Sequence, residues 1–554
     1  MNIMKRKLPL LAIAFIGLAL AAHPAPARAA DATTQIRLNT VGFIPGKEKK
    51  ASIAATNCTD FSVVRVMDGA VVFQGLVTGP VTNTDTSELL YIADFSKFKK
   101  TGDFQLDVPG VGISAPFRVA SDVYDEPFHL AMAGMYLWRC GTAVKFDYKS
   151  EMFQHGVCHT NDAWMDLVTG QHVKVESLKG WHDAGDYNKY VINAGVTVGC
   201  MYRAWADFPS LHKVKLAIPE SGGKLPDFLA EIKWETDWLL TMQLPDGSVS
   251  HKISTMNFGG FILPEQETAD RFFVPWASAA TADFVAMMAE TARYMRPYDK
   301  AYAERCLAAA RKSYEFLKAH PANHDADMMG VTTGGYGTDD RDDRLWAAAE
   351  LWETTGDAEA LRDFEARAKS IQGRVDAVWD WGSVGNLGLF TYEFSKRHRR
   401  DAALVNEIRT NIISVADGIV RARDNHGYGR PLGTFYNWGC NGEVARQVVN
   451  LQAAYRLARK PEYIETSLDA LNHLFGRNYC GRSFVTGLGF LPPMHPHDRN
   501  SAGDDVVDPL PGRLVGGANP RATSWQDVQA NYRVNEIAIN WNGALIYALA
   551  AAQR

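Results

Sequence analysis

The stretch WHDAGDYNKY, Trp181 to Tyr190, places two aspartates three positions apart among aromatic residues, a glycine and a histidine. Hydrolysis of a sugar acetal requires one carboxylic acid that protonates the leaving oxygen and one carboxylate that activates water or attacks carbon. Asp183 and Asp186 are candidates for the second of these functions. Two acids beside a glycine also occur in turns and calcium sites, so this stretch alone leaves those interpretations open.

A further acid stands near the other end of the chain. In WQDVQANYRVNEIAINWNGALIYALAAAQR, Trp525 to Arg554, Glu536 lies where an apolar helix is expected to begin. A lone glutamate in a first helical turn commonly interacts with the helix dipole or with the free backbone N–H groups. Taken alone, Glu536 therefore indicates a helix start. A catalytic role for it is considered only together with the Asp183 stretch.

Composition limits the classes of partner. The chain has 554 residues, of which 46% are hydrophobic and 11% aromatic, enough for a large core and more than one domain. Its formal net charge is −5. Because no basic excess is present, nucleic acids and anionic membranes are poor candidates, and a neutral partner fits better.

The N-terminus has the order of a secretory signal peptide. Lys5, Arg6 and Lys7 precede the apolar run LPLLAIAFIGLALAA, which is followed by small residues up to Ala29 and Ala30. We predict a signal peptide over residues 1–30, cleaved near Ala29 or Ala30, and a secreted or periplasmic protein with no membrane association after cleavage. The alternative is an uncleaved membrane anchor, for which the apolar run is short.

The residues that follow have the character of a small β-domain. FSVVRVM and AVVFQGLV are separated by Asp68 and Gly69, a two-residue signal for a tight hairpin. DFQLDV and APFRVA continue the alternating pattern beyond Gly and Pro residues. The sequence therefore predicts a β-sandwich over residues 31–120.

Beyond residue 120 the hydrophobic period becomes helical. Val444, Val448, Leu451 and Tyr455, for example, fall on one helix face. We expect roughly eleven helical segments joined by long loops rich in Gly, Pro, Trp and His. The clearest are Asp227–Gln243, Ser278–Met295, Tyr302–Ala319, Asp342–Glu353, Ala402–Arg423, Pro461–Phe475 and Glu536–Ala552.

Several spaced motifs together resemble glycoside hydrolase family 9, the inverting cellulases, in particular members with an N-terminal immunoglobulin-like domain. The motifs are, in chain order, QIRLNTVGFIPG, RCGTAV, VCHTNDA, WHDAGDY, DDRLWAAAEL, SFVTGLG, HPHDR and NEIAINWN. Their order is more specific than any one of them. The resemblance implies a mainly α fold, in which an (α/α)6 toroid forms the catalytic domain over residues 121–554, preceded by an immunoglobulin-like β-sandwich over residues 31–120.

The resemblance also implies roles for the acids. Asp186 corresponds to the general base that deprotonates water, Asp183 helps to hold that water, and Glu536 corresponds to the general acid. An inverting enzyme separates its acid and base by roughly 6.5 to 9.5 Å, which leaves room for the water molecule. Because the acid must be protonated before it acts, we expect partial desolvation to raise its pKa.

Sugar recognition requires aromatic platforms with polar groups at their edges. We predict that Tyr336, Trp381 and Trp438 contact substrate, although each of these aromatic residues is equally compatible with a core position. His497 and Arg499 match the histidine and arginine that the family uses near its catalytic centre. We therefore include both among the expected substrate-binding residues.

Cys140, Cys158, His159 and His182 provide two thiolates and two imidazoles, the donor set of a closed tetrahedral zinc site. A Cys140–Cys158 disulfide is the alternative, although seven cysteines cannot all be paired. Similarity to zinc-bearing relatives favours structural Zn²⁺. Such a site would fix the loop that carries Asp183.

The segment TDDRDDR concentrates aspartates before a predicted helix. Dense carboxylate oxygens suit Ca²⁺, and relatives bind calcium in this region. We predict Asp339, Asp342 and Asp343 as calcium ligands. A solvated acidic helix start explains the same residues without a metal.

The expected function is that of a secreted, monomeric endo-β-1,4-glucanase, which hydrolyses internal bonds of cellulose-type glucans with inversion. One alternative is an exo-acting cellobiohydrolase, glucosidase or glucosaminidase of the same family. Another is a non-catalytic carbohydrate-binding protein on the same fold, against which the presence of Asp183, Asp186 and Glu536 argues. A polysaccharide lyase on a similar toroid is a further alternative. It is disfavoured because such an enzyme cleaves acidic polysaccharides and would favour a basic cleft.

Overall fold

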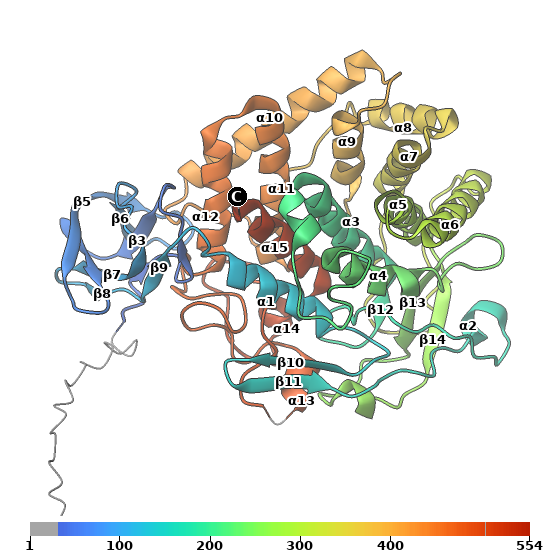
Figure 1. The fold of residues 1–554 in the computed structure, drawn as a ribbon, viewed down its shortest axis with the longest axis horizontal. Coiled ribbons are helices and arrows are strands. Elements are labelled where there is room, and N and C mark those ends of the chain that lie inside the picture. Colours follow the sequence, from blue (N-terminus) through green and yellow to red (C-terminus); the bar gives the residue numbers. More distant parts are fainter. Residues whose placement is uncertain (1–31, 505, 554) are drawn as a thin grey trace, which may run out of the picture.

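The computed structural model describes residues 32–504 and 506–553. The predicted signal peptide, residues 1–30 with its cleavage position at Ala29 or Ala30, lies outside the described residues. Within the described ranges, no helix has both the length and the apolar character needed to cross a membrane. The chain forms a β-domain beside a larger helical body (Figure 1).

The β-domain is a sandwich whose strand order is β1-β3-β6-β5-β4-β7-β9-β2, with β8 paired to β7. The long strand β5 pairs with β4 through its first half and with β6 through its second half, so it passes from one layer to the other. The predicted hairpin at Asp68 and Gly69 is confirmed between β4 and β5. The strands are β1 (Ile36–Arg37), β2 (Gly42–Phe43), β3 (Lys50–Ala54), β4 (Asp60–Arg65), β5 (Val71–Thr82), β6 (Leu89–Asp94), β7 (Gly102–Val108), β8 (Gly112–Ile113) and β9 (Phe117–Val119).

Twelve helices of ten or more residues lie in the described part of the chain, and they alternate between inner and outer positions. The inner six are α3 (Val191–Asp207), α5 (Ser278–Met295), α7 (Arg341–Thr355), α9 (Gly385–Phe394), α11 (Cys440–Ala458) and α15 (Ile539–Ala552). The outer six are α1 (Asp125–Tyr136), α4 (Asp227–Leu239), α6 (Lys300–Ala319), α8 (Ala358–Ser370), α10 (Ala402–Asp424) and α12 (Pro461–Leu474).

Burial explains this arrangement. The inner helices α5, α11 and α15 are buried on nearly every side, whereas the outer helices α6, α8 and α10 bury one face only. Successive helices pair as hairpins, and α15 closes the ring by packing on α3 and α11 (Figure 1). The predicted (α/α)6 toroid is therefore confirmed.

The predicted helix limits differ from the structure at one functional position. The predicted segment Ser278–Met295 coincides with α5. The segment predicted from Glu536 onward begins instead at Ile539, because Glu536 lies in extended backbone at the end of α14 (Tyr532–Asn535). Glu536 therefore precedes the helix that we expected to contain it.

Shorter elements occupy the loops between the helices. A hairpin joins β10 (Val144–Tyr148) to β11 (Glu151–His155), and a second sheet contains β12 (Lys189–Tyr190), β13 (Ser250–Thr255) and β14 (Arg271–Trp276). Short helical turns are α2 (Asp166–Thr169), η2 (Pro209–Lys213), η3 (Pro264–Gln266) and α13 (Arg499–Gly503). The strand β12 begins three positions after Asp186 and anchors one end of the acidic loop.

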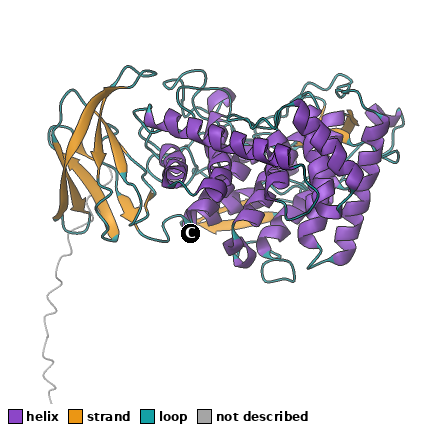
Figure 2. Ribbon diagram, turned by 90° about the horizontal axis from the view of Figure 1, so that it is seen from above, coloured by secondary structure: helices purple, strands orange, loops and turns teal. Residues whose placement is uncertain are grey.

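The β-domain lies against one side of the helical body (Figure 2). Ser52 Oγ donates to the carbonyl of Gly427 at 2.8 Å, and Asn39 Nδ2 donates to Asn472 Oδ1 at 3.0 Å. Asp85 Oδ2 accepts a hydrogen bond from the Tyr436 hydroxyl at 2.6 Å. The β-domain thus contacts both the end of α12 and the segment that precedes α11.

Candidate active site

The loop Trp181–Tyr190 is held by the outer helix α4. Glu235 Oε2 accepts a hydrogen bond from the Trp181 backbone N–H at 2.6 Å, and Glu231 Oε1 accepts one from Trp181 Nε1 at 2.9 Å. Residues four apart share a helix face, so both carboxylates point toward the same part of the loop. The start of the acidic loop is therefore fixed to a rigid element.

The two aspartates of this loop are buried and have different partners. Asp186 Oδ2 accepts hydrogen bonds from Asn188 Nδ2 at 2.6 Å and from the Tyr190 hydroxyl at 2.9 Å. Asp183 accepts from Asn193 Nδ2 and from the Tyr336 hydroxyl, each at 2.7 Å. Each carboxylate thus has a fixed orientation, set by side chains from the loop, from α3 and from the distant Tyr336 segment.

The charge environment distinguishes the acids. Burial and the neighbouring Asp186 carboxylate raise the pKa of Asp183 well above its ordinary value. Lys252 on β13 supplies a buried ammonium group nearby, held by Thr333 Oγ1 and the Gly334 carbonyl at 2.8 Å each. Burial lowers the pKa of Lys252 to about 8, against the opposing effect of Asp186 and Asp183. Sequence reasoning missed this lysine, since nothing in its strand links it to the acids.

Glu536 reaches the same site through backbone pairing. Its carbonyl accepts a hydrogen bond from the Gly516 N–H at 2.8 Å, and the Ile539 N–H that opens α15 donates to the Asp183 carbonyl at 2.9 Å. Burial, followed by the charges of Asp186 and Asp183, raises the pKa of Glu536 well above its ordinary value. This direction matches the protonated acid that we expected.

All three acids line one open cleft with a volume of about 980 Å³. The five predicted substrate-binding residues also line it: Tyr336, Trp381, Trp438, His497 and Arg499. The structure therefore brings together every predicted catalytic and substrate-binding residue, from segments across the chain. The cleft is wide enough for several sugar units, which occupy far less than this volume each.

The three predicted aromatic residues have different surroundings. Trp438 is 47% exposed and presents an open face to the cleft. Trp381 is partly buried and meets Tyr336 edge-on, with ring centroids 5.0 Å apart. Tyr336 donates its hydroxyl to Asp183, so it orients an acid as well as lining the cleft. Its contact with Asp183 was not predicted from the sequence.

His497 and Arg499 are both tied to backbone. His497 Nδ1 lies 2.8 Å from the Gln529 carbonyl, so this nitrogen carries the hydrogen, and burial lowers the pKa of His497. Arg499 donates through Nη1 to the Gly185 carbonyl at 2.8 Å and through Nε to the Gly259 carbonyl at 3.1 Å. Arg499 therefore bridges the acidic loop and a second loop that borders the cleft.

Other cleft residues were missed by sequence reasoning. Phe258 and Trp541 add aromatic surface, and Asp380, Glu443 and Asn540 add polar groups. Asp380 is engaged by Arg446 and by Asn540 Nδ2, whereas one carboxylate oxygen of Glu443 is buried without a hydrogen-bond partner among the described residues. Asn540 and Trp541 lie in the NEIAINWN motif and Asp380 precedes Trp381, so proximity to predicted residues could have indicated these three. Phe258 and Glu443 reach the cleft through tertiary packing.

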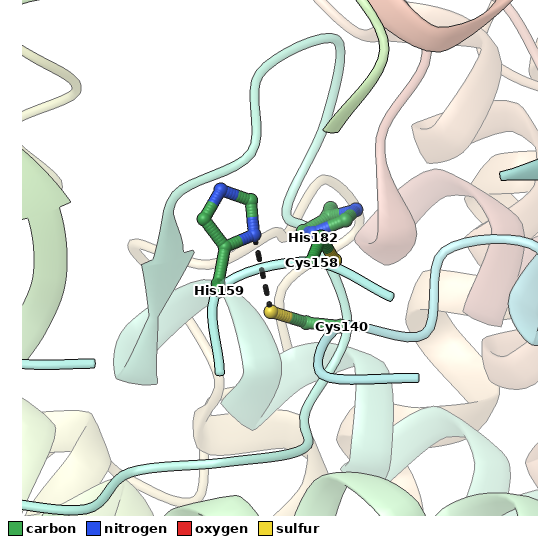
Figure 3. A group of neighbouring side chains, drawn as sticks. All are labelled: Cys140, Cys158, His159 and His182. Carbon is green, nitrogen blue, oxygen red and sulfur yellow. Dashed lines mark hydrogen bonds between the residues drawn. The ribbon is translucent and has the colours of Figure 1, made fainter. Parts of the chain in front are cut away.

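The four predicted metal ligands converge beside the acidic loop (Figure 3). Cys140 Sγ lies 3.6 Å from His159 Nδ1, Cys158 Sγ lies 3.7 Å from His182 Nε2, and all four ligand atoms fall within 4.8 Å of one another. Sulfur and nitrogen ligands of tetrahedral zinc are separated by about 3.5 Å. Both cysteines are free thiols, so the disulfide alternative does not apply. The donor set and spacing fit a closed zinc site.

The three predicted calcium ligands do not converge. Asp339 is exposed and pairs with Arg341, whereas Asp342 Oδ2 accepts the backbone N–H groups of Val384 and Gly385 at the start of α9. Asp343 is buried and directed toward α5. Across the described ranges, the Cys140 cluster alone brings three or more potential ligands together. Asp339, Asp342 and Asp343 therefore form no side-chain cluster of their own, because neighbouring residues at a helix start point in different directions, and calcium binding stays a prediction.

Carboxyl groups gathered in an open cleft are what hydrolysis of a glycosidic bond requires, and the comparisons place the chain in a class that performs it. The chain belongs to glycosyl hydrolase family 9: the model of that family matches residues 124–549, and the model of the cellulase N-terminal ig-like domain matches residues 31–113.

Individual relatives agree with this family membership. The chain is 57% identical to Endoglucanase D of Acetivibrio thermocellus over 521 residues, which is 93% of this chain and 83% of that protein. A metagenome-derived family 9 endoglucanase has a crystal structure with TM-score 0.88 and 32% identity, covering 94% of this chain and 99% of that one. A zinc-binding triple mutant of endoglucanase J30 gives TM-score 0.85 and 32% identity, covering 92% and 99%.

Proposed function

We propose that this chain is an endo-β-1,4-glucanase that hydrolyses internal bonds of cellulose-type glucans with inversion of configuration. The observation that carries the proposal is the meeting of Asp183, Asp186 and Glu536 in one open cleft of about 980 Å³. Family membership and the similarity to Endoglucanase D support the same activity. An open cleft admits a long chain at an internal position, whereas exo action requires a blocked end.

Glu536 is the proposed general acid. Its raised pKa favours the protonated carboxyl, which can donate a proton to the glycosidic oxygen as the bond to the anomeric carbon breaks. The negative charges of Asp183 and Asp186 favour that protonated form. The same two charges stabilise the positive character that develops on the sugar ring.

Asp186 is the proposed general base. Its Oδ2 atom accepts hydrogen bonds from Asn188 and Tyr190, and the other carboxylate oxygen is the proposed acceptor for the proton of the attacking water. Asp183, oriented by Asn193 and Tyr336, is the proposed second contact of that water. Attack by this water on the face opposite the leaving group inverts the anomeric carbon.

Substrate binding is assigned to Trp381 and Trp438 as sugar platforms, with Tyr336 beside them. His497 and Arg499 are the proposed polar contacts near the scissile bond. His497 offers Nε2 to the cleft because Nδ1 is bound to Gln529. A flat aromatic surface with polar groups at its edge suits the apolar faces and equatorial hydroxyls of a β-1,4-glucan.

Glu536→Gln and Asp186→Asn test the assignment. We expect each to lower kcat about 10²- to 10⁴-fold while cellohexaose binding, measured by calorimetry, is retained. Glu304→Gln, which removes an exposed carboxylate on α6, is the control and should keep wild-type rates. Near-normal turnover in either site variant would contradict the assigned roles.

Proton NMR of cellohexaose during early digestion tests the stereochemistry and the mode of attack. We expect α-anomeric product ends and mixed product lengths. β-Anomeric ends would refute the role of Asp186, and a single short product from the outset would establish exo action. Absence of cleavage together with retained binding would establish a carbohydrate-binding protein instead.

Structural zinc, export and domain organisation complete the proposal. Cys140, Cys158, His159 and His182 would hold Zn²⁺, which supplies a rigid crosslink beside the acidic loop and no catalytic step. We propose residues 31–120 as the immunoglobulin-like domain and 121–554 as the catalytic domain of a monomer. The signal sequence at residues 1–30 supports a secreted or periplasmic location.

A further inference from the structure

One wall of the cleft is an irregular loop that follows β13. Residues 256–267, called the lip below, carry Phe258 and Phe261 at their exposed side. Phe258 is 51% exposed and lines the cleft together with the three acids. Apart from the short turn η3, the lip has no regular structure of its own, so other segments must hold it in place.

The first attachment of the lip is to a predicted metal ligand. His159 directs Nδ1 toward Cys140 Sγ, and its Nε2 lies 3.3 Å from Glu267 Oε2 (Figure 3 shows the Nδ1 side). When Nδ1 is the ligand atom, Nε2 carries the hydrogen and donates it to the Glu267 carboxylate. The Glu267 side chain is only 6% exposed, so this contact is shielded from water.

The second attachment runs through the acidic loop. The Tyr187 hydroxyl donates to the Ile262 carbonyl of the lip at 2.5 Å. The ring of Tyr187 packs on that of His182, with centroids 4.9 Å apart. A second metal ligand is therefore in contact with the residue that holds the middle of the lip.

Contacts inside the lip connect Glu267 to the residues that face the cleft. A Cβ atom at Gly259 would lie 2.4 Å from Glu267 Oε1, so the carboxylate packs directly on the Gly259 backbone. The Gly259 carbonyl accepts from Arg499, whose guanidinium lies 5.4 Å from the Phe258 ring and 5.5 Å from the Phe261 ring. Glu267 and Phe258 are thus linked through one backbone position.

We propose that Glu267 is a positioning residue through which the metal site holds the lip, so that Phe258 becomes a metal-dependent substrate contact. The inference rests on the proposed function and on the proposed zinc. Loss of the metal would release His159, then Glu267 and the lip, and would weaken sugar binding at this wall. The metal site would then organise two walls of the cleft, one through Asp183 and one through Phe258.

Metal affinity tests the first link without any catalytic assay. We expect Glu267→Ala to lower the affinity for Zn²⁺, measured by chelator competition, about 10- to 100-fold. Glu267→Gln keeps an acceptor for His159 and should restore most of that loss. Glu265→Gln is the matched control, because Glu265 is exposed in the same loop. In Co²⁺-loaded protein, the visible spectrum should change in Glu267→Ala and stay unchanged in the control.

Tyr187→Phe tests the second link, because it removes the bond to Ile262 and keeps the ring on His182. We expect unchanged Zn²⁺ affinity, faster proteolytic cleavage within residues 256–267, and a several-fold higher KM for cellohexaose with a smaller change in kcat. Metal-free wild-type protein and Phe258→Ala should show the same rise in KM.

Several results would overturn the inference. Wild-type protein that takes up no zinc, or a Glu267→Ala variant with the metal affinity of Glu265→Gln, would refute the link to the metal. A lip that resists protease equally with and without zinc would refute the metal-dependent wall. Zinc affinity and protease resistance can be measured without glucanase activity. If both behave as expected but no substrate is cleaved, the proposed function fails while this inference stands.

Discussion

At the level of single residues, the carboxyl groups of the site differ in their surroundings rather than in their chemistry. Asp186 is held by two donors on one oxygen, whereas the carboxyl of Glu536 is buried opposite two negative charges. Hydrogen-bond donors favour a carboxylate, and burial beside like charges favours a carboxylic acid. The surroundings of Glu536 therefore favour its proposed role as the acid.

Removing one of the two negative charges should move the pH dependence of activity. Asp183 raises the pKa of Glu536, so Asp183→Asn should lower that pKa. Activity falls as the acid loses its proton, and we therefore expect the alkaline limb of kcat to move to lower pH. The measurement is the pH profile of the residual activity on cellohexaose.

A suitable control for this experiment is Asp339→Asn, which changes an exposed acid outside the cleft. Its alkaline limb should coincide with that of the wild type. If the alkaline limb of Asp183→Asn lies at the same pH as in the wild type, or at a higher pH, then Asp183 does not stabilise the protonated form of Glu536.

The catalytic residues could be predicted from the sequence because they sit in motifs, but their partners from distant segments could not. The hydroxyl of Tyr336 reaches Asp183 across 153 positions, and Lys252 stands on a strand with no acidic motif nearby. Such contacts depend on how the loops of different hairpins meet. We could therefore anticipate Tyr336 as an aromatic cleft residue, but not as the partner of an acid.

At the level of the helices, an acidic pair lies between α5 and α7. Asp283 faces Asp343, both are buried, and burial together with the charge of Asp343 raises the pKa of Asp283 well above its ordinary value. Asp342, the residue before Asp343, instead accepts hydrogen bonds from the backbone N–H groups at the start of α9. The acidic segment thus divides into a helix cap and a buried pair.

The buried pair should make stability depend on pH. Because the folded protein keeps a proton that the unfolded chain releases near pH 4, the pair stabilises the fold fully at lower pH. That contribution is lost as pH rises toward the folded pKa, at about 1.4 kcal/mol per unit. We expect Asp283→Asn to raise Tm, and more at pH 8 than at pH 5, as measured by calorimetry.

The exposed variant Asp339→Asn again provides the comparison, since its Tm should change little at either pH. An Asp283→Asn variant whose Tm falls equally at both values would show that the pair contributes packing and hydrogen bonding rather than an ionisation penalty.

Helix positions were predictable where the hydrophobic period is strong and the ends are local. α5 begins and ends as predicted, because its apolar face continues to Met295. The predicted start at Glu536 was wrong, because Gly516 pairs with this backbone and holds it extended. That pairing comes from another loop, so local sequence could not indicate it.

At the level of the whole molecule, the β-domain supports one rim of the cleft. Asp85 accepts hydrogen bonds from Tyr436 and from His426 Nε2, at 2.6 and 3.0 Å. Tyr436 stands two residues before Trp438, whose exposed ring lines the cleft. A turn of the β-domain therefore fixes the segment that presents a sugar platform.

Loss of the contact between Asp85 and Tyr436 should weaken substrate binding. We expect Asp85→Ala to raise KM for cellohexaose several-fold and to lower Tm, because Tyr436 and His426 lose a buried partner. Steady-state kinetics and calorimetry measure the two effects. Asp60→Ala, in a strand of the same domain where the carboxylate accepts from Thr59, is the control. A normal KM in Asp85→Ala would limit the β-domain to a stabilising role.

The order of domains could be predicted from periodicity, but the way they dock could not. The polar contacts that join Asn39 to Asn472 and Ser52 to Gly427 involve residues with no distinctive sequence context. Surface complementarity between two folded units is a property of their tertiary structures. Periodicity therefore indicated a β-sandwich followed by a helical domain, the family resemblance implied the toroid, and neither indicated which loops meet.

The hydrogen bond between the Ile539 N–H and the Asp183 carbonyl has a consequence for the timing of biosynthesis. The loop with the proposed base leaves the ribosome hundreds of residues before its acid partner, so the nascent chain lacks the proton donor until Glu536 has been made. Any product that stops before Glu536 lacks both the proton donor and the closing helix. Hydrolytic activity therefore reports that translation went beyond this point and that the ring has closed.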